Sequence, residues 1–96
     1  MSPLPSEPEY DLYLFVAGSS ATSLAAQRNI QAICSEHLSG RYSLQVVDAQ
    51  QHPARAVAEE LLGLPCLIKK RPGLVRRLVG DLSDRPRVLK ALGLLA

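Results

Sequence analysis

The sequence predicts one α/β domain with four strands and three helices in the order βαβαββα. The chain has 96 residues, enough for a single domain with a modest hydrophobic core. Stretches rich in β-branched and aromatic residues alternate with segments in which apolar residues recur at helical spacing. A Pro-Gly turn signal separates the last two apolar stretches, which predicts a hairpin. We expect residues 1–96 to form this domain, with residues 1–10 as a flexible, Pro-rich N-terminal segment.

The first half of the chain predicts a strand, a helix and a second strand. Residues 11–17 (DLYLFVA) are rich in aromatic and β-branched residues and run into a turn at Gly18. Apolar residues then recur at helical spacing from about 20 to 38, and Gly40 supplies a stop. Residues 41–48 (RYSLQVVD) read as the second strand. Because such a crossover is normally right-handed and joins parallel strands, we expect these two strands to be parallel.

The second half predicts a short helix and a hairpin. Residues 52–63 begin with a Pro near the start, contain good helix formers and end at a Gly. Residues 64–68 (LPCLI) begin a third strand, and residues 69–73 (KKRPG) carry the turn signal. Residues 74–80 (LVRRLVG) then form the fourth strand. We expect the last two strands to pair antiparallel.

The final segment predicts a helix of about twelve residues. Ser83 or Asp84 can cap it, and Pro86 lies in the first turn, where a missing N–H costs least. Gly93 weakens a helix and a strand alike, and near the end of the chain it could terminate the helix. Apolar residues line one face: Val88, Leu89, Leu92 and Leu95.

Composition narrows the class of protein. No apolar run approaches the length of about 20 residues that a membrane-spanning helix needs, and the polar, acidic N-terminus is unlike a signal peptide, so we expect a cytoplasmic protein. The net charge is +2, but eight of the eleven Lys and Arg residues lie between 69 and 90. The run KKRPGLVRR (69–77) could meet an acidic protein surface or a nucleic acid. No stacking aromatic residue lies in 69–90, so the nucleic-acid interpretation is disfavoured.

The predicted element order, with a Pro at the start of the third strand, is thioredoxin-like. A thiol oxidoreductase of this fold needs two cysteines in the turn after the first strand, where this chain has Ser19-Ser20-Ala21-Thr22. We interpret these hydroxyl residues as helix caps. Cys66 follows Pro65 and could be a redox sensor, but a reduced, inert strand residue is the simpler interpretation. The two cysteines and two histidines have no metal-ligand spacing, so no cofactor is expected.

Several stretches resemble the KaiB family of circadian clock proteins. They are LYLFVAG (12–18), most of 42–88 and the final leucines, and RRLVGDLSDR (76–85) is the most specific. The resemblance implies a non-enzymatic protein-binding module of a circadian clock or related signalling system. Family members switch between a ground state of βαββααβ order, often tetrameric, and a monomeric thioredoxin-like state. The second state binds the ATPase ring of KaiC, recruits KaiA and competes with the sensor kinase SasA.

The chain departs from the family at positions that bear on this switch. Ala91 stands where a Gly is common, and Gly to Ala within a helix is worth roughly 0.5–1 kcal/mol. Pro86 replaces a common Glu and fits a first helical turn better than a central strand. We therefore predict a mainly monomeric, thioredoxin-like resting state. The expected determinants of the switch are Pro65, Asp84, Pro86, Ala91 and Gly93.

The partner surface also departs from the family. Ala25 and Gln45 stand at positions that are basic in the family, and Ser43 replaces a neighbouring Ala. Two charges that would steer association are therefore missing, which leaves open a KaiB paralogue with a non-clock partner. A thiol-linked redox protein using Cys66 is the less favoured alternative. The partner-binding residues expected from the sequence are Ala25, Ser43, Gln45, Lys69, Lys70, Arg76 and Arg77.

Overall fold

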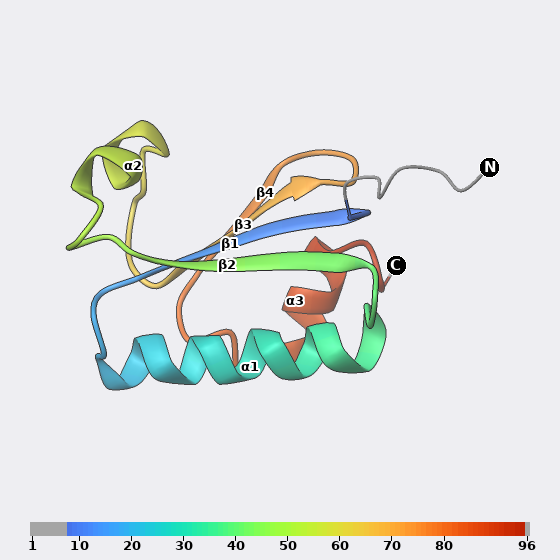
Figure 1. Cartoon of the computed structure of the whole chain (residues 1–96). Helices are drawn as coiled ribbons and strands as arrows, with labels where there is room; N and C mark the ends of the chain where they lie inside the picture. Colours follow the sequence, from blue (N-terminus) through green and yellow to red (C-terminus); the bar gives the residue numbers. More distant parts are fainter. Residues whose placement is uncertain (1–7, 96) are drawn as a thin grey trace.

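A computed structural model of the chain describes residues 8–95 and confirms the predicted order βαβαββα (Figure 1). The elements are β1 (Tyr10–Val16), α1 (Ala21–His37), β2 (Tyr42–Asp48), α2 (Pro53–Ala58), β3 (Cys66–Arg71), β4 (Arg76–Val79) and α3 (Arg85–Ala91). The strands form one sheet in the order β2-β1-β3-β4. β1 and β2 are parallel, and β3 is antiparallel to both β1 and β4. β2 and β4 are therefore the two edge strands.

The two faces of the sheet have different covers. α1 and α3 lie against one face, and the short α2 lies at one end of the other (Figure 1). Because side chains alternate along a strand, Leu12, Leu14 and Val16 of β1 all point toward α1 and α3. They pack there with the buried stripe of α1, which includes Ile30 and Ile33. This contact is the main hydrophobic core.

The start of α1 is capped by local hydrogen bonds. The Ser20 hydroxyl accepts a hydrogen bond from the Ser23 N–H at 3.2 Å, as expected for an N-cap. The Ser23 hydroxyl in turn accepts from the Ala17 N–H at 3.0 Å, which fixes the turn after β1. The prediction that hydroxyl residues of this turn cap the helix is confirmed at Ser20.

Three predicted boundaries were wrong in the second half. The helix expected over 52–63 ends at Ala58, and Glu60 then takes a left-handed conformation with φ of 53°. The third strand, expected to begin at residue 64, runs from Cys66 to Arg71 and extends into the predicted turn, because its main chain pairs with β1 and β4. The turn is confined to residues 72–75, with Gly73 at φ of 69°.

The last helix is shorter than predicted but is capped as expected. α3 has seven residues rather than about twelve. Asp84, not Ser83, is the N-cap and accepts a hydrogen bond from the Arg87 N–H at 3.3 Å. At the other end Gly93 has φ of 76°, and the Leu94 N–H donates to the Leu89 carbonyl at 2.8 Å. This is a Schellman-type end, so Gly93 terminates the helix.

The first strand also begins earlier than expected. Tyr10, placed by the sequence prediction in the flexible segment, starts β1 and is buried. Its hydroxyl donates to the Leu92 carbonyl at 2.8 Å, and its main-chain N–H donates to the Arg41 carbonyl at 2.9 Å. These contacts with distant residues hold Tyr10 in the sheet. Residues 1–7 of the expected segment lie outside the described residues.

Candidate functional site

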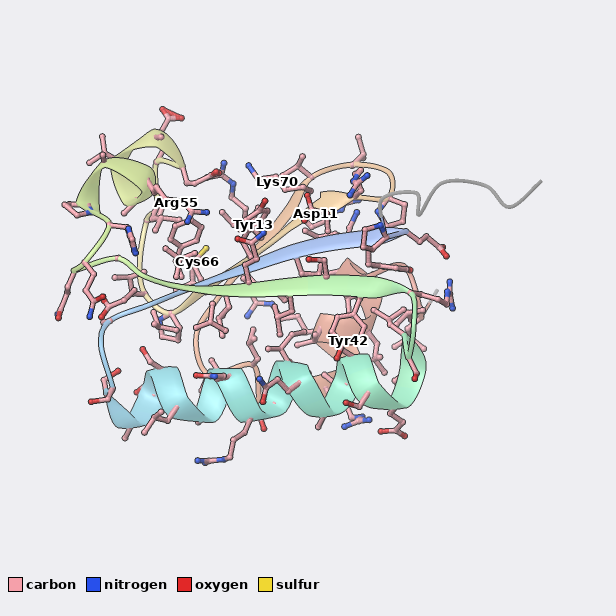
Figure 2. All side chains as sticks on the ribbon, viewed as in Figure 1. Asp11, Tyr13, Tyr42, Arg55, Cys66 and Lys70 are labelled. Carbon is pink, nitrogen blue, oxygen red and sulfur yellow. The ribbon has the colours of Figure 1, made fainter. Side chains whose placement is uncertain are left out.

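The face of the sheet that is turned away from α1 is largely open. Pairing across the four strands aligns Gln45, Tyr13, Ile68 and Arg77 in one row on this face. The next row, which includes Phe15 and Cys66, is covered by α2 and the segment that follows it (Figure 2). Apart from Ile68, which is fully buried, the remainder of the face presents half-buried or exposed side chains. We define this open face by Asp11, Tyr13, Ser43, Gln45, Lys70 and Arg77.

Glu59 links the end of α2 to the open face. Its carboxylate accepts two hydrogen bonds from Lys70 Nζ, at 2.8 and 3.0 Å, and lies 3.8 Å from the Arg77 guanidinium. Arg77 also donates to the Glu59 main-chain carbonyl. Sequence reasoning missed Glu59, because it follows the helical residues and its partners lie 11 and 18 positions away. The Glu59 carboxylate therefore contacts Lys70 and Arg77, two of the basic residues that the sequence predicts to bind a partner.

The open face carries a cation–π contact at Tyr13 and an ion pair at Asp11. The Arg55 guanidinium lies over the ring, 5.9 Å from its centroid, and Figure 2 shows the two side chains together above Cys66. Asp11, near the start of β1, lies 3.9 Å from the Arg71 guanidinium. Pairs of this kind are worth about 0–1 kcal/mol each when exposed. They orient side chains on the face without giving it a strong net charge.

The structure brings together four of the seven predicted partner-binding residues. Ser43, Gln45, Lys70 and Arg77 all belong to the open face. The placement of Lys70 depends on a register shift between β1 and β3, since Asp11 pairs with Arg71 and Leu12 pairs with Lys69. Lys70 is the extra residue of this bulge.

The other three predicted residues lie elsewhere. Ala25 is half-buried on α1. Lys69 and Arg76 pair with each other across β3 and β4, and with Leu12 they belong to the face that carries α1 and α3. Alternation along each strand separates Lys69 from Ile68 and Arg76 from Arg77. The basic hairpin is thus divided between two faces.

The expectation that Lys69 is an exposed member of the basic run was wrong. It is 5% exposed, and its ammonium group donates to the carbonyls of Pro72 and Leu74, the latter at 2.6 Å. Burial, and secondarily the charge of Arg76, lower the pKa of Lys69. Its side chain therefore holds the β3–β4 turn closed instead of facing a partner.

The cysteines are poorly placed for thiol chemistry. Cys34 packs in the main core, and burial raises its pKa to about 11. Burial also raises the pKa of Cys66, and Glu59 adds to this while Arg77 opposes it. A thiolate is the reactive form, so both environments disfavour the nucleophile that a thiol-linked activity needs. Within residues 8–95 no three His, Cys, Asp or Glu side chains gather as a metal site.

The predicted determinants of fold switching have local roles in this structure. The Pro65 carbonyl accepts a hydrogen bond from the Gly80 N–H at 2.9 Å. Asp84 and Gly93 cap α3, Pro86 lies in its first turn and Ala91 is its last residue. Four of the five residues thus support the helical form of the C-terminal segment. Their part in a switch stays a prediction.

The sequence as a whole matches a known protein family. The KaiB domain family matches residues 13–94. The chain belongs to the KaiB family. It is 43% identical over 86 residues to the circadian clock oscillator protein KaiB of Prochlorococcus marinus strain MIT 9313, covering 90% of this chain and 72% of that protein. It is 40% identical over 95 residues to the protein of that name from Trichodesmium erythraeum, covering 99% and 89%.

Solved structures share the fold of this chain. The N-terminal domain of Synechococcus elongatus SasA superposes on this KaiB-family chain with a TM-score of 0.73 and 26% identity, over 97% of this chain and 91% of that domain. Chloroplastic thioredoxin z superposes with a TM-score of 0.71 and 21% identity, over 88% and 75%. The second likeness confirms the thioredoxin-like fold. In the part of the chain that the structure describes, no helix is long and apolar enough to span a membrane.

Proposed function

We propose that this KaiB-family chain is a non-enzymatic protein-binding module of a circadian clock or a related signalling system, with a KaiC-type ATPase ring as its partner. The observation that carries the proposal is the open face, which presents Ser43 and Gln45 on the edge strand β2, Lys70 on β3 and Arg77 on the opposite edge strand β4. Single edge strands and uncovered sheet faces are common protein-binding surfaces. Through such a ring, KaiA or a sensor kinase would be reached indirectly.

Exposed apolar residues at the end of the open face support a protein partner. Leu62 is 99% exposed and Val57 is 75% exposed, and Leu64 and Val79 are also exposed. Val57 lies in α2, Leu62 and Leu64 lie in the segment that connects α2 to β3, and Val79 lies on β4 beside Gly63 of that segment. Contiguous apolar side chains with polar groups around them are typical of protein interfaces.

The charge of the open face predicts a slow association. Glu59 neutralises part of the charge of Lys70 and Arg77, and Gln45 is uncharged where the family resemblance implies a basic residue. Electrostatic steering raises association rates more than it raises affinity. The complex would therefore depend on apolar contact and shape, with a weak dependence on salt.

A charge scan tests the proposal against a purified KaiC-type ATPase ring. Gln45→Glu should weaken binding because it adds a negative charge to the open face, and Gln45→Lys should strengthen it. Gln31→Glu is the matched control, since Gln31 is exposed on α1 and receives the same charge. Isothermal titration or analytical size exclusion reads out the complex. Equal effects of Gln45→Glu and Gln31→Glu would place the interface elsewhere.

The second candidate is a KaiB paralogue with a non-clock protein partner. The uncharged Ala25 and Gln45 favour it, because they remove the charges implied for a KaiC-facing surface. Absence of any complex with KaiC-type rings at high micromolar concentration, for the wild type and for Gln45→Lys, would select this candidate. Either function would be carried out in the cytoplasm.

The resting state belongs to the same proposal. The free protein is mainly a thioredoxin-like monomer, because Asp84, Pro86 and Gly93 all favour the helical C-terminal segment. Backbone NMR chemical shifts over 84–95, with a diffusion coefficient from the same sample, test it. Strand shifts together with a tetramer would instead indicate the βαββααβ ground state.

A further inference from the structure

A second surface, which shares only Arg77 with the open face, lies where β4 meets α3. Arg76, Arg77, Leu78, Arg87, Lys90 and Ala91 line a groove of about 290 Å³. Arg76, Arg87 and Lys90 are exposed, and within residues 8–95 none of them forms an ion pair. The neighbouring carboxylate of Asp84 is occupied as the cap of α3. Three cationic side chains without an ion-pair partner among the described residues therefore line one groove together with the apolar Leu78 and Ala91.

The main chain of β4 is open along the same groove. β4 pairs only with β3 among the described strands. The Gly80 N–H donates toward β3, to the Pro65 carbonyl, and hydrogen-bonding groups alternate sides along an antiparallel strand. The N–H and C=O groups of Arg77 and Val79 therefore point away from β3. An extended segment could pair with them.

We infer that β4 accepts an extended acidic segment of a partner protein as a fifth strand of the sheet. Side chains of an added strand alternate between faces, so every second one would lie over the groove of Arg76, Arg87 and Lys90. Carboxylates at those positions form charge-assisted hydrogen bonds with the three cations. The intervening side chains meet the exposed Val79 on the other face, which favours apolar residues there.

Two other occupants fit this surface less well. A second copy of the chain pairing through β4 would bring Arg76 and Arg77 of both copies together, and like charges opposite one another destabilise a strand pair. A single-stranded nucleic acid would find cations, but the groove has no aromatic side chain for base stacking. Neither occupant uses both the cations and the free main-chain groups.

A peptide titration tests the inference on the full chain. The probe is a fluorescein-labelled peptide of about eight residues that alternates Glu and Val, and a peptide with Gln in place of Glu is its neutral counterpart. We expect only the acidic peptide to bind by fluorescence anisotropy. Replacing Arg76, Arg87 and Lys90 together by Gln should weaken binding at least about tenfold. Arg28→Gln, an exposed charge on α1, should change binding by less than about twofold.

The main-chain contribution has its own matched pair of variants. Val79→Pro removes an outward N–H from an edge strand without removing a bond to β3, whereas Val79→Ala shortens the side chain and keeps the N–H. We expect Val79→Pro to weaken binding several-fold more than Val79→Ala. If Val79→Pro does not fold, a peptide N-methylated at alternate residues tests the same hydrogen bonds on the wild type.

Three results would overturn the inference. One is no binding of the acidic peptide at millimolar concentration, which would leave the basic edge as protection against aggregation. Another is equal binding of the N-methylated and unmodified peptides. The third is tighter binding of a single-stranded oligonucleotide of equal charge, since charge alone would then explain the contact.

Discussion

The two faces of the sheet differ in how completely they are covered, and the difference separates stability from binding. Among the described residues, fourteen buried side chains form the cluster on the α1 and α3 face, and four form the cluster beneath α2. α1 is 17 residues long and follows the whole length of the sheet, whereas α2 has six residues and no buried side chain. The first face therefore supports the fold, and the second leaves side chains free to bind.

The largest expected loss of stability comes from shortening a buried side chain on the face that α1 and α3 cover. Leu14 is fully buried between the sheet and α1, so Leu14→Ala should lower the free energy of unfolding by about 2–5 kcal/mol. Gln45→Ala on the open face should change it by less than about 0.5 kcal/mol. Urea unfolding measures both. Similar losses for the two variants would mean that the open face contributes to stability as much as the covered one.

A smaller effect is expected at the end of α3. Gly93 has φ of 76°, and no atom lies within 4 Å of the point where the Cβ of a larger residue would stand. Gly93→Ala therefore meets only a backbone penalty of about 1–2 kcal/mol. Gly93→Asn should lose less, because Asn tolerates this conformation better. Thermal unfolding compares the two variants. No difference between Ala and Asn would argue against a left-handed residue at this position in solution.

On the open face, removing the charge of Glu59 should have an effect of less than about 1 kcal/mol on global stability. Glu59→Gln weakens the contacts with Lys70 and Arg77 that hold α2 over the sheet, and Cys66 lies beneath that cover. Labelling by a maleimide should therefore accelerate at Cys66 and stay slow at Cys34. Mass spectrometry after proteolysis distinguishes the two thiols. Equal acceleration at both would indicate global rather than local opening.

The smallest expected effect is the acid dependence due to Asp81, which is fully exposed. Hydrogen bonds from Ser83 lower the pKa of Asp81 below its ordinary value of 3.8. A carboxyl with a lowered pKa stabilises the fold above its unfolded-state pKa, and this contribution is lost as the pH falls through the folded-state value. Wild type should thus exceed Asp81→Asn in stability above the ordinary carboxyl pKa of 3.8, and the two should converge as the pH falls below it. A stability difference between wild type and Asp81→Asn that grows as the pH falls would contradict a lowered pKa of Asp81 in the folded state.

Much of the fold could be predicted from the sequence because its signals act over a few residues. A cap bonds to a main-chain group within about four positions, so Ser20, Asp84 and Gly93 act as their residue types suggest. The helix-period pattern of 20–38 likewise predicted α1, whose apolar stripe recurs within each turn. The resemblance to the KaiB family rested on the same linear information and was confirmed.

The candidate site depended on contacts between residues far apart in the chain. Whether a basic residue of the hairpin faces a partner or the interior follows from the register of β3 against β1, including the bulge at Lys70. That register buries Lys69, and alternation along β4 separates Arg76 from Arg77, although all three lie in one basic run. Glu59 belongs to the site only because α2 ends at Ala58, which places the Glu59 carboxylate within hydrogen-bond distance of Lys70 on the sheet.

By itself the sequence determined the order of elements, the helix caps and the family. The tertiary structure decided which side chains share a face, how far β3 extends and which charges are already paired. The physical reason is one of range. Caps and periodicity are set by neighbours along the chain, whereas strand register is set by pairing between strands, and a shift of one residue moves a side chain to the opposite face.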